Sequence, residues 1–82
     1  MTHRLTSPSI TIGRGSENDI VLNDANVSRV HARLSQDAMG AWKINDLGST
    51  NGTSLNQRLI QQALLHDGDA ITIGLTTLEF RA

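Results

Sequence analysis

Five side chains suited to binding an anion lie in three polar segments of the sequence. They are two arginines and three hydroxyl residues, Arg14, Ser28, Arg29, Ser49 and Thr50. Arginine makes charge-assisted and often bidentate hydrogen bonds to phosphate, and hydroxyl and loop N–H groups can fill the remaining acceptor positions. Because the set includes no aromatic ring, thiol or clustered carboxylate, it predicts a binding site for a tetrahedral oxyanion.

Each of these residues has a simpler explanation when it is taken alone. Arg14 could be a surface arginine that is solvated or paired with Glu17 or Asp19. Ser28 could be a turn hydroxyl that hydrogen-bonds its own backbone, a common role for serine. The prediction of an anion site therefore depends on the combination of residues and not on any one of them.

Ser28 and His31 could suggest a nucleophile and its base. A catalytic pair needs a third group that orients the histidine, and no acid is placed to do so; both residues also lie on one short segment. The better interpretation is that the imidazole of His31 hydrogen-bonds the backbone of a neighbouring loop and locks two loops together. The sequence therefore predicts binding without catalysis and no catalytic residue.

The acidic residues and histidines lack the spacing of metal ligands. The acids are scattered through turns, and residues 46–52 lack both the spacing and the terminal glutamate of a calcium loop. The histidines, His3, His31 and His66, are isolated from one another. We expect neither a metal nor a cofactor.

The loops that carry these residues must be positioned by strands, because apolar and polar residues alternate with a period of two. The alternation predicts short strands at residues 9–12, 20–22, 30–35, 42–44, 71–73 and 78–80. Residues 59–65 could form a helical turn or a strand, and we favour a strand or irregular structure because the segment lacks a cap and is too short for a stable helix. Many short strands separated by turns predict an all-β domain, a sandwich or a barrel.

Residues 45–53 form the predicted loop whose backbone conformation is most closely specified by its residue types. The segment is too polar for the core, and its glycines and Asx residues allow backbone conformations with positive φ. Gly48 and Gly52 permit the turns, so the loop can hold a fixed shape on the surface.

The composition excludes several classes of protein. A chain of 82 residues is one domain with one small core, and a net charge of -1 argues against a generally basic nucleic-acid binder. The aromatic residues are Trp42 and Phe80; Trp42 is in phase with Ile44 and is predicted to lie in the core. With no cysteine, no signal peptide and no apolar run of about 18 residues, we expect a cytoplasmic protein that does not insert into membranes.

Several motifs in a fixed order resemble those of the forkhead-associated (FHA) domain, and the match is strongest from about residue 9 to residue 80. The motifs are Thr11-Ile12-Gly13-Arg14, Asn18-Asp19-Ile20-Val21-Leu22, Val27-Ser28-Arg29-Val30-His31-Ala32, Asp46-Leu47-Gly48-Ser49-Thr50-Asn51-Gly52-Thr53, Asp67-Gly68-Asp69 and Ile73-Gly74. The resemblance implies that residues 1–82 form a single FHA domain, a two-sheet β-sandwich of the FHA/SMAD-like kind. It also implies that loops at one end bind phosphothreonine in a partner protein.

The resemblance further implies a role for each matched residue. The positions that hold the phosphate in FHA domains correspond to Arg14, Ser28, Arg29 and Thr50. The position that binds the backbone of the peptide corresponds to Asn51. The positions that keep the loops in shape correspond to Gly13, His31, Gly52 and Thr53. All of these residues are intact, which favours the phosphate-binding form of the domain.

The N-terminal part of the chain departs from the family pattern. FHA domains usually carry two strands before the segment matched by residues 10–14, whereas residues 1–9 have room for about one, which we expect at residues 2–6. The missing strand would leave a sheet edge unpaired. Such an edge invites self-association or masking by another segment of a longer protein, so a phosphate-independent interaction or self-association module is the alternative function.

Overall fold

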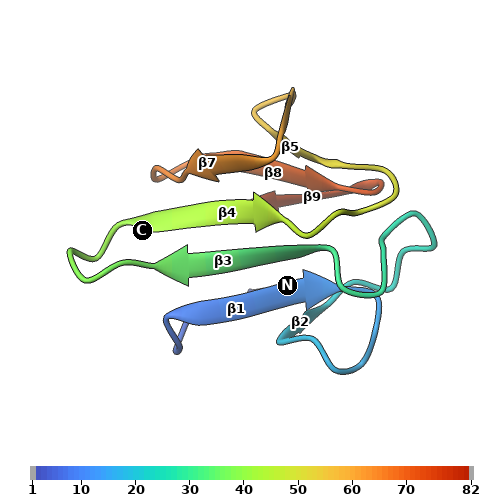
Figure 1. Cartoon of the computed structure of the whole chain (residues 1–82), viewed down its shortest axis with the longest axis horizontal. Helices are drawn as coiled ribbons and strands as arrows, with labels where there is room; N and C mark the ends of the chain where they lie inside the picture. Colours follow the sequence, from blue (N-terminus) through green and yellow to red (C-terminus); the bar gives the residue numbers. More distant parts are fainter. Residues whose placement is uncertain (1, 82) are drawn as a thin grey trace.

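The structure, a computed structural model, describes residues 2–81, and these contain strands and turns but no helix (Figure 1). The strands in chain order are β1 (Ser9–Gly13), β2 (Ile20–Val21), β3 (Ala32–Gln36), β4 (Trp42–Asp46), β5 (Thr53–Leu55), β6 (Arg58–Ile60), β7 (Gln62–Leu64), β8 (Ala70–Ile73) and β9 (Thr76–Glu79). Among the described residues there is accordingly no helix long and apolar enough to cross a membrane.

The strands form two sheets that share one core. The first sheet has the order β2-β1-β3-β4-β7 and the second has the order β6-β5-β8-β9. Neighbouring strands are antiparallel except for β1 and β2, which are parallel. This arrangement confirms the predicted all-β sandwich of two sheets, and strands β6 and β7 confirm that residues 59–65 do not form a helix.

The core consists of aliphatic side chains contributed by both sheets. The buried apolar residues are Ile10, Ile12, Ile20, Leu22, Val27, Ala32, Leu34, Ile44, Leu65, Ile71, Ile73 and Phe80. Trp42 is half-buried against this cluster, with its ring centroid 6.4 Å from that of Phe80 at an interplanar angle of 61°. An edge-to-face aromatic pair of this kind stabilises the packing of the two rings. Trp42 therefore lies at the border of the core and faces it, as its alternation in phase with Ile44 predicted.

The strand register brings three loops to the same end of the first sheet. Ile12 near the end of β1 lies opposite Ala32 at the start of β3, and Ala32 lies opposite Asp46 at the end of β4. The loop after β1, the loop before β3 and the loop after β4 therefore leave the sheet side by side, at the right-hand end in Figure 1. The fold itself brings the polar segments of the sequence together.

The prediction of a strand at residues 2–6 is wrong. These residues adopt no strand and make no backbone hydrogen bond within the described part of the chain; Met1 lies outside that part. Leu5 instead packs its side chain on the core. The physical reason is that this segment has no strand alongside it to accept a ladder of hydrogen bonds, since pairing between β1 and β3 ends where Gln36 N–H donates to Pro8 O.

The predicted phase of residues 30–35 is correct within β3 and wrong before it. Ala32 and Leu34 are buried as expected, but Val30 is exposed and His31 is fully buried. The strand begins only at Ala32, so Val30 and His31 belong to the preceding loop, where side-chain alternation does not apply. The side chain of His31 points into the protein because it is hydrogen-bonded there to Ser28 N–H and Gly52 O.

Candidate functional site

The loop after β1 and the loop before β3 are joined by main-chain hydrogen bonds. Arg14 N–H donates to Ser28 O and Gly15 N–H to Arg29 O, each at 3.0 Å, and His31 N–H donates to Ile12 O at 2.8 Å. These bonds extend the pairing of β1 with β3 into the loops. The two arginines and the serine are consequently held on one continuous backbone frame.

Arg14 follows the last residue of β1, and its side chain is exposed but held in one orientation. Its Nε–H donates to Val27 O at 3.1 Å, and the terminal guanidinium nitrogens have no partner among the described residues. The suggested ion pair with Glu17 or Asp19 is absent there, since Asp19 instead accepts from Thr11 N–H at 2.9 Å. The four N–H donors of these two nitrogens thus remain available at a fixed position.

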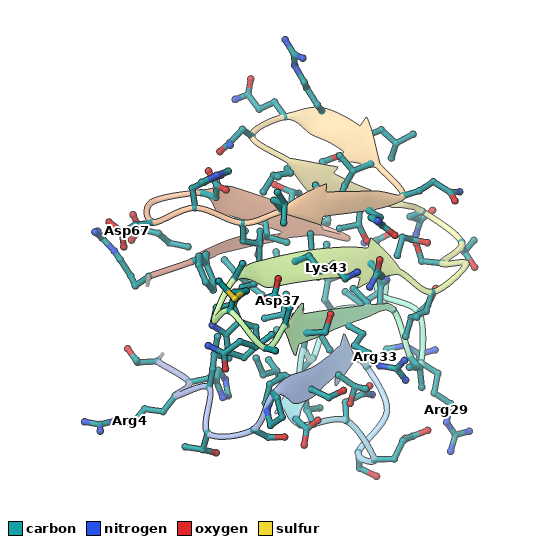
Figure 2. The ribbon with its side chains drawn as sticks, turned by 60° about the vertical axis from the view of Figure 1, so that its left-hand side comes forward. Arg4, Arg29, Arg33, Asp37, Lys43 and Asp67 are labelled. Atoms are coloured by element: carbon teal, nitrogen blue, oxygen red, sulfur yellow. The ribbon has the colours of Figure 1, made fainter. Side chains whose placement is uncertain are left out.

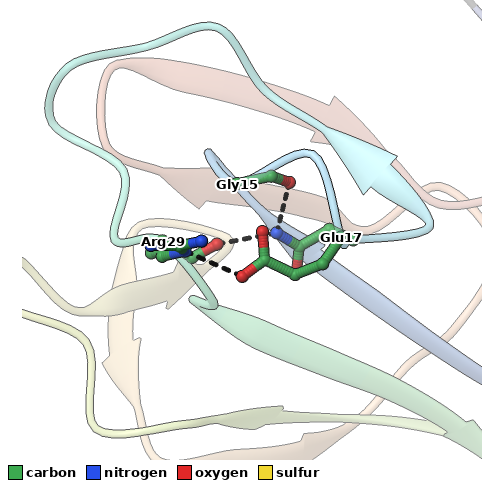
Figure 3. Close-up of polar contacts among 4 residues, drawn as sticks. Gly15, Glu17 and Arg29 are labelled. Atoms are coloured by element: carbon green, nitrogen blue, oxygen red, sulfur yellow. Dashed lines mark hydrogen bonds and ion pairs between the residues drawn. The ribbon is translucent and has the colours of Figure 1, made fainter.

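Arg29 is the arginine that pairs with Glu17, as Figure 3 shows beside Gly15. The Nε–Oε2 distance is 2.8 Å, and the Arg29 side chain is 79% exposed. A hydrogen bond from its own backbone, and then the one from Arg29, lowers the pKa of Glu17 below its ordinary value. An anion that binds Arg29 must therefore compete with this carboxylate or share the guanidinium with it.

Ser28 connects the loop before β3 to the loop after β4. Its Oγ accepts the backbone N–H of Thr50 at 3.0 Å, while its own N–H donates to Nδ1 of His31 at 3.0 Å. Because the hydroxyl oxygen accepts this bond, its proton is free to be donated to a bound anion. Between Ser28 and His31 the described structure has the bond from the serine backbone and none from its hydroxyl.

His31 is fully buried between two loops. Its Nδ1 accepts from Ser28 N–H, and its Nε2 lies 2.8 Å from the carbonyl oxygen of Gly52, to which it can only donate. These two partners assign the tautomer with the proton on Nε2. One imidazole thus ties the loop before β3 to the loop after β4.

Asp46 organises the loop after β4 and was missed in the sequence. Its carboxylate accepts hydrogen bonds from Ser49 N–H, from the Ser49 hydroxyl and, at 2.7 Å, from the Thr53 hydroxyl. The Ser49 oxygen in turn accepts from Gly52 N–H at 2.9 Å. The signal that could have revealed Asp46 is its position three residues before a serine, the spacing of an aspartate that caps a turn.

Ser49 therefore does not belong to the anion-binding set in which the sequence placed it. Its hydroxyl donates to Asp46 and accepts from Gly52, so it is engaged inside the loop. Thr53 is fully buried at the start of β5, although the sequence indicates that residues 45–53 are too polar for the core. Its hydroxyl is accommodated because Asp46 accepts the proton.

Thr50 and Asn51 lie exposed at the tip of this loop, and each is held by a hydrogen bond to the loop before β3. Asn51 Nδ2 donates to Asn26 O at 2.8 Å, and Thr50 N–H donates to Ser28 Oγ. Gly48 and Gly52 both have positive φ, 72° and 83°. The structure thus brings Arg14, Ser28 and Thr50 together directly, places Arg29 beside them, and leaves Gly48 at the outer turn.

Two further residues, to which the sequence analysis gave no role, also fix the loops by hydrogen bonds. The buried amide of Asn18 donates to Gly15 O at 2.7 Å and to Arg29 O at 2.6 Å, while its Oδ1 has no partner among the described residues. Asp24 accepts from Asn26 N–H, from Leu75 N–H and from the Thr76 hydroxyl, each at 2.8 Å. These bonds, led by the one from Asn26, lower the pKa of Asp24. Both residues sit in turns, where their long-range partners cannot be read from spacing.

We expect Asp46→Ala to destabilise the domain by about 1–3 kcal/mol at pH 7, because three donors lose their acceptor. Burial alone would raise the pKa of Asp46, but the hydrogen bonds from Ser49 and Thr53 outweigh it and lower the pKa below its ordinary value of 3.8. A lowered folded-state pKa stabilises the fold above that value, and this stabilisation disappears as the pH falls through the folded-state pKa. Urea unfolding of both proteins from pH 7 to pH 2 should show a difference that is constant to about pH 4 and shrinks below it. A constant difference down to pH 2 would contradict this role.

Gly13→Ala is expected to destabilise the domain by about 1–3 kcal/mol through crowding. A Cβ at this position would collide with the carbonyl oxygen of Arg29 and lie 2.7 Å from Nδ2 of Asn18, and the first of these is backbone that cannot move aside. The matched control is Gly48→Ala, where a Cβ would meet no described atom within 4 Å and only the positive φ is strained. Thermal unfolding measures both, and the control gives the cost of positive φ without crowding, about 1–2 kcal/mol. A loss below about 0.5 kcal/mol in Gly13→Ala would show that Gly13 is not required for the close approach of the loops.

Comparison with protein families gives a match over most of the chain. The family model described as FHA domain matches residues 10–74. The ABC transporter ATP-binding/permease protein Rv1747 of Mycobacterium tuberculosis is 42% identical over 98% of this chain and 9% of its own length. The glycogen accumulation regulator GarA of Mycolicibacterium smegmatis is 38% identical over 93% of this chain and 48% of its own length. The chain thus spans half or less of these relatives.

Solved structures give the same result. A chain from a structural and functional study of phosphothreonine-dependent FHA domain interactions superimposes with a TM-score of 0.94 at 36% identity, covering 100% of this chain and 84% of that one. Mycobacterium tuberculosis EmbR in complex with a low-affinity phosphopeptide superimposes with a TM-score of 0.86 at 41% identity, covering 94% of this chain and 20% of that one. The likeness therefore extends over almost all of the described fold.

Proposed function

The chain belongs to the FHA domain family, and from this premise we propose that it docks phosphothreonine-containing partner proteins through the three loops at one end of the sandwich. The proposal is a binding module without catalysis. The observation that carries it is the hydrogen bond from Thr50 N–H to Ser28 Oγ, which leaves the serine proton free beside the unpaired end of Arg14.

The phosphate would be held by Arg14, Ser28, Arg29 and Thr50. Arg14 supplies its two terminal guanidinium nitrogens, Ser28 its hydroxyl proton, and Thr50 its exposed hydroxyl. Arg29 adds charge once Glu17 gives way. Charge-assisted hydrogen bonds contribute about 1.5–3 kcal/mol each, against an association cost of several kcal/mol. Three or four such bonds lead us to expect a micromolar dissociation constant, or about -8 kcal/mol.

Asn51 is proposed to bind the backbone of the peptide. One Nδ2 hydrogen is already donated to Asn26 O at 2.8 Å, which fixes the amide plane. The side-chain oxygen is left to accept a peptide N–H, and the second Nδ2 hydrogen is left to donate to a peptide carbonyl. Gly13, His31, Gly48, Gly52 and Thr53 would act indirectly, by keeping the loops in shape. The cytoplasmic location of the chain and the absence of nucleic acid among its partners stay predictions.

The experiment that tests this function is a binding screen with peptide libraries in three matched forms, containing threonine, phosphothreonine or phosphoserine. We expect micromolar binding to phosphothreonine peptides, weaker binding to phosphoserine, and none to threonine. Failure of every phosphothreonine peptide to bind better than its unphosphorylated form would overturn the proposal.

Self-association is the second candidate, and one observation favours it. Within residues 2–81, strand β9 pairs with β8 and with no second strand, and a cavity of about 420 Å³ beside it has Ile12, Leu78 and Phe80 among its lining residues. An unpaired edge next to an apolar hollow can accept a further strand. Light scattering at increasing protein concentration, with and without phosphopeptide, would separate this function from phosphate-dependent docking.

A further inference from the structure

The dipeptide Asn51-Gly52 in the loop after β4 is a chemically labile pair. The backbone nitrogen of a glycine can attack the side-chain amide carbon of an asparagine that precedes it, because glycine has no side chain to shield that nitrogen. Of all the asparagines in the chain, only Asn51 precedes a glycine. Spontaneous deamidation is therefore expected at this asparagine before any other.

The geometry of the loops requires both residues of this pair. Gly52 has a φ of 83°, and a Cβ there would lie 2.6 Å from Leu59 Cδ1, so the position needs glycine. Asn51 joins the loop after β4 to the loop before β3, because its Nδ2 donates to Asn26 O at 2.8 Å. The chain cannot avoid the labile pair without losing one of these contacts.

The reaction consumes water and releases ammonia. The Gly52 nitrogen loses its proton to hydroxide and forms a bond to Cγ of Asn51, while the bond from Cγ to Nδ2 breaks. Nδ2 takes up a proton from water and leaves as ammonia, and the product is a cyclic succinimide. Water then opens one of the two ring carbonyls, so that position 51 becomes aspartate or isoaspartate.

Hydrogen bonds hold the two reacting groups on different partners. Gly52 N–H donates to Ser49 Oγ at 2.9 Å, and the proton of that same hydroxyl is donated to Asp46. The amide of Asn51 is held by Asn26 O in the other loop. The nitrogen must leave Ser49 and the amide must turn away from Asn26 before they can meet. Ring closure consequently requires this part of the loop to open.

We infer that Asn51 is the site at which this chain deamidates, and that the Ser49 hydroxyl suppresses the reaction in the folded domain. This gives a role to a serine that is engaged inside the loop. The modification itself does not depend on the proposed function, but its consequence rests on that function. Deamidation removes the Nδ2 donor and adds a negative charge next to Thr50, and this charge opposes the binding of a phosphorylated peptide.

Asp67-Gly68 is the other pair in the chain that can form a succinimide. The N–H of Gly68 donates to Phe80 O at 2.8 Å, so this nitrogen is held by a backbone carbonyl and not by a side chain. Ring closure there starts from a carboxyl group and releases water, and opening of the ring restores the original mass. Only the reaction at Asn51 changes the mass of the chain.

The test is incubation of the chain at mildly alkaline pH, in buffer and unfolded in urea, followed by peptide mapping with mass spectrometry. In urea we expect position 51 to deamidate faster than every other asparagine. In buffer it should react at least about tenfold more slowly, because only the open loop can react. Ser49→Ala in buffer should react at least about fivefold faster than the folded wild type, because the lost hydrogen bond raises the population of the open loop.

Two control variants separate the Ser49 hydroxyl from general destabilisation. Ser49→Thr keeps a hydroxyl that accepts from Gly52 N–H, and its rate should stay within about twofold of the wild type. Ile71→Val weakens the core, since Ile71 of β8 is 2% exposed, but it touches no bond of the loop after β4. Its rate should also stay within about twofold, because local opening does not require global unfolding.

Amide hydrogen exchange at Gly52 tests the same protection without any variant. We expect this N–H in the folded wild type to exchange at least about tenfold more slowly than in the unfolded chain. Exchange at the unfolded rate would overturn the inference, and so would equal deamidation in buffer and urea. A rate for Ser49→Ala no higher than that for Ile71→Val would overturn it too. Circular dichroism checks that each variant is folded.

The consequence for binding is measured on the purified deamidated chain. We expect it to bind a phosphothreonine peptide at least about tenfold more weakly than the unmodified chain does. Equal affinity would overturn the consequence, and the proposed function would stand. If the unmodified chain binds no phosphopeptide, the proposed function fails, while the deamidation and exchange rates still decide the inference about Asn51 and Ser49.

Discussion

Arg14→Ala and Ser28→Ala are each expected to weaken phosphopeptide binding at least about a hundredfold, which would place it beyond detection for a micromolar interaction. Arg14 provides its two terminal guanidinium nitrogens at a position fixed by Val27 O, and Ser28 provides a hydroxyl whose oxygen already accepts Thr50 N–H. Truncation of either side chain to alanine leaves the phosphate oxygens with fewer hydrogen-bond donors. Isothermal titration calorimetry with one phosphothreonine peptide measures the loss.

Arg4→Ala is the matched control, since it removes the same charge far from the loops. Figure 2 shows Arg4 and Arg29 projecting from opposite ends of the molecule. We expect its effect on affinity to stay within twofold at 0.15 M salt, where charges separated by more than about 8 Å are screened. Equal losses for Arg4→Ala and Arg14→Ala would show that net charge, and not a structured phosphate site, drives binding.

Arg29 provides an internal comparison with Arg14. It is 79% exposed and paired with Glu17, so its contribution to phosphate binding is reduced by the pair that must be broken or shared. Its loss should therefore matter less than the loss of Arg14. The structure thus predicts unequal contributions to phosphate binding from two arginines that the sequence does not distinguish.

The strands of this domain could be predicted because the alternation of apolar and polar residues that marks a strand lies within the strand's own sequence. Alternation fixed the buried face of β1, β3 and β8 correctly, as in Ile10 and Ile12 or Ile71 and Ile73. It failed at Val30 and His31, where the chain is already in a loop and the direction of each side chain is set by distant hydrogen bonds. It also failed at residues 2–6, because a strand needs a partner and the sequence does not show which edge is free.

Only part of the loop scaffold could be predicted from the sequence: the residue types indicated that His31 joins two loops and that Gly48 and Gly52 permit turns. Asp46, Asn18 and Asp24 hold the loops through contacts between segments up to 52 residues apart, such as that from Thr76 to Asp24. Residue type alone classed all three as ordinary turn residues. Ser49 shows the opposite error, since a hydroxyl beside Thr50 seemed equally available and is in fact used by Asp46 and Gly52.

His31→Ala is expected to destabilise the domain by about 3–5 kcal/mol and to abolish phosphopeptide binding together with the fold of the loops. The substitution leaves Ser28 N–H and Gly52 O without their partner, and a buried polar group that loses its hydrogen bond costs about 1–3 kcal/mol. The cavity left by the imidazole adds to this. Against a total stability of roughly 5–15 kcal/mol this is a large fraction, and the midpoint of thermal unfolding should fall by at least about 12 °C.

His66→Ala separates this effect from the general loss of a histidine. The His66 side chain is 78% exposed and lies 3.8 Å from Asp69, so its removal should change stability by less than about 0.5 kcal/mol. If His31→Ala unfolds within 1 kcal/mol of the wild type, water must replace the imidazole between the loops. In that case the loop geometry would depend on Asp46, Asn18, Asp24 and the glycines, and Ser28 would keep its position because Thr50 N–H still donates to its hydroxyl oxygen.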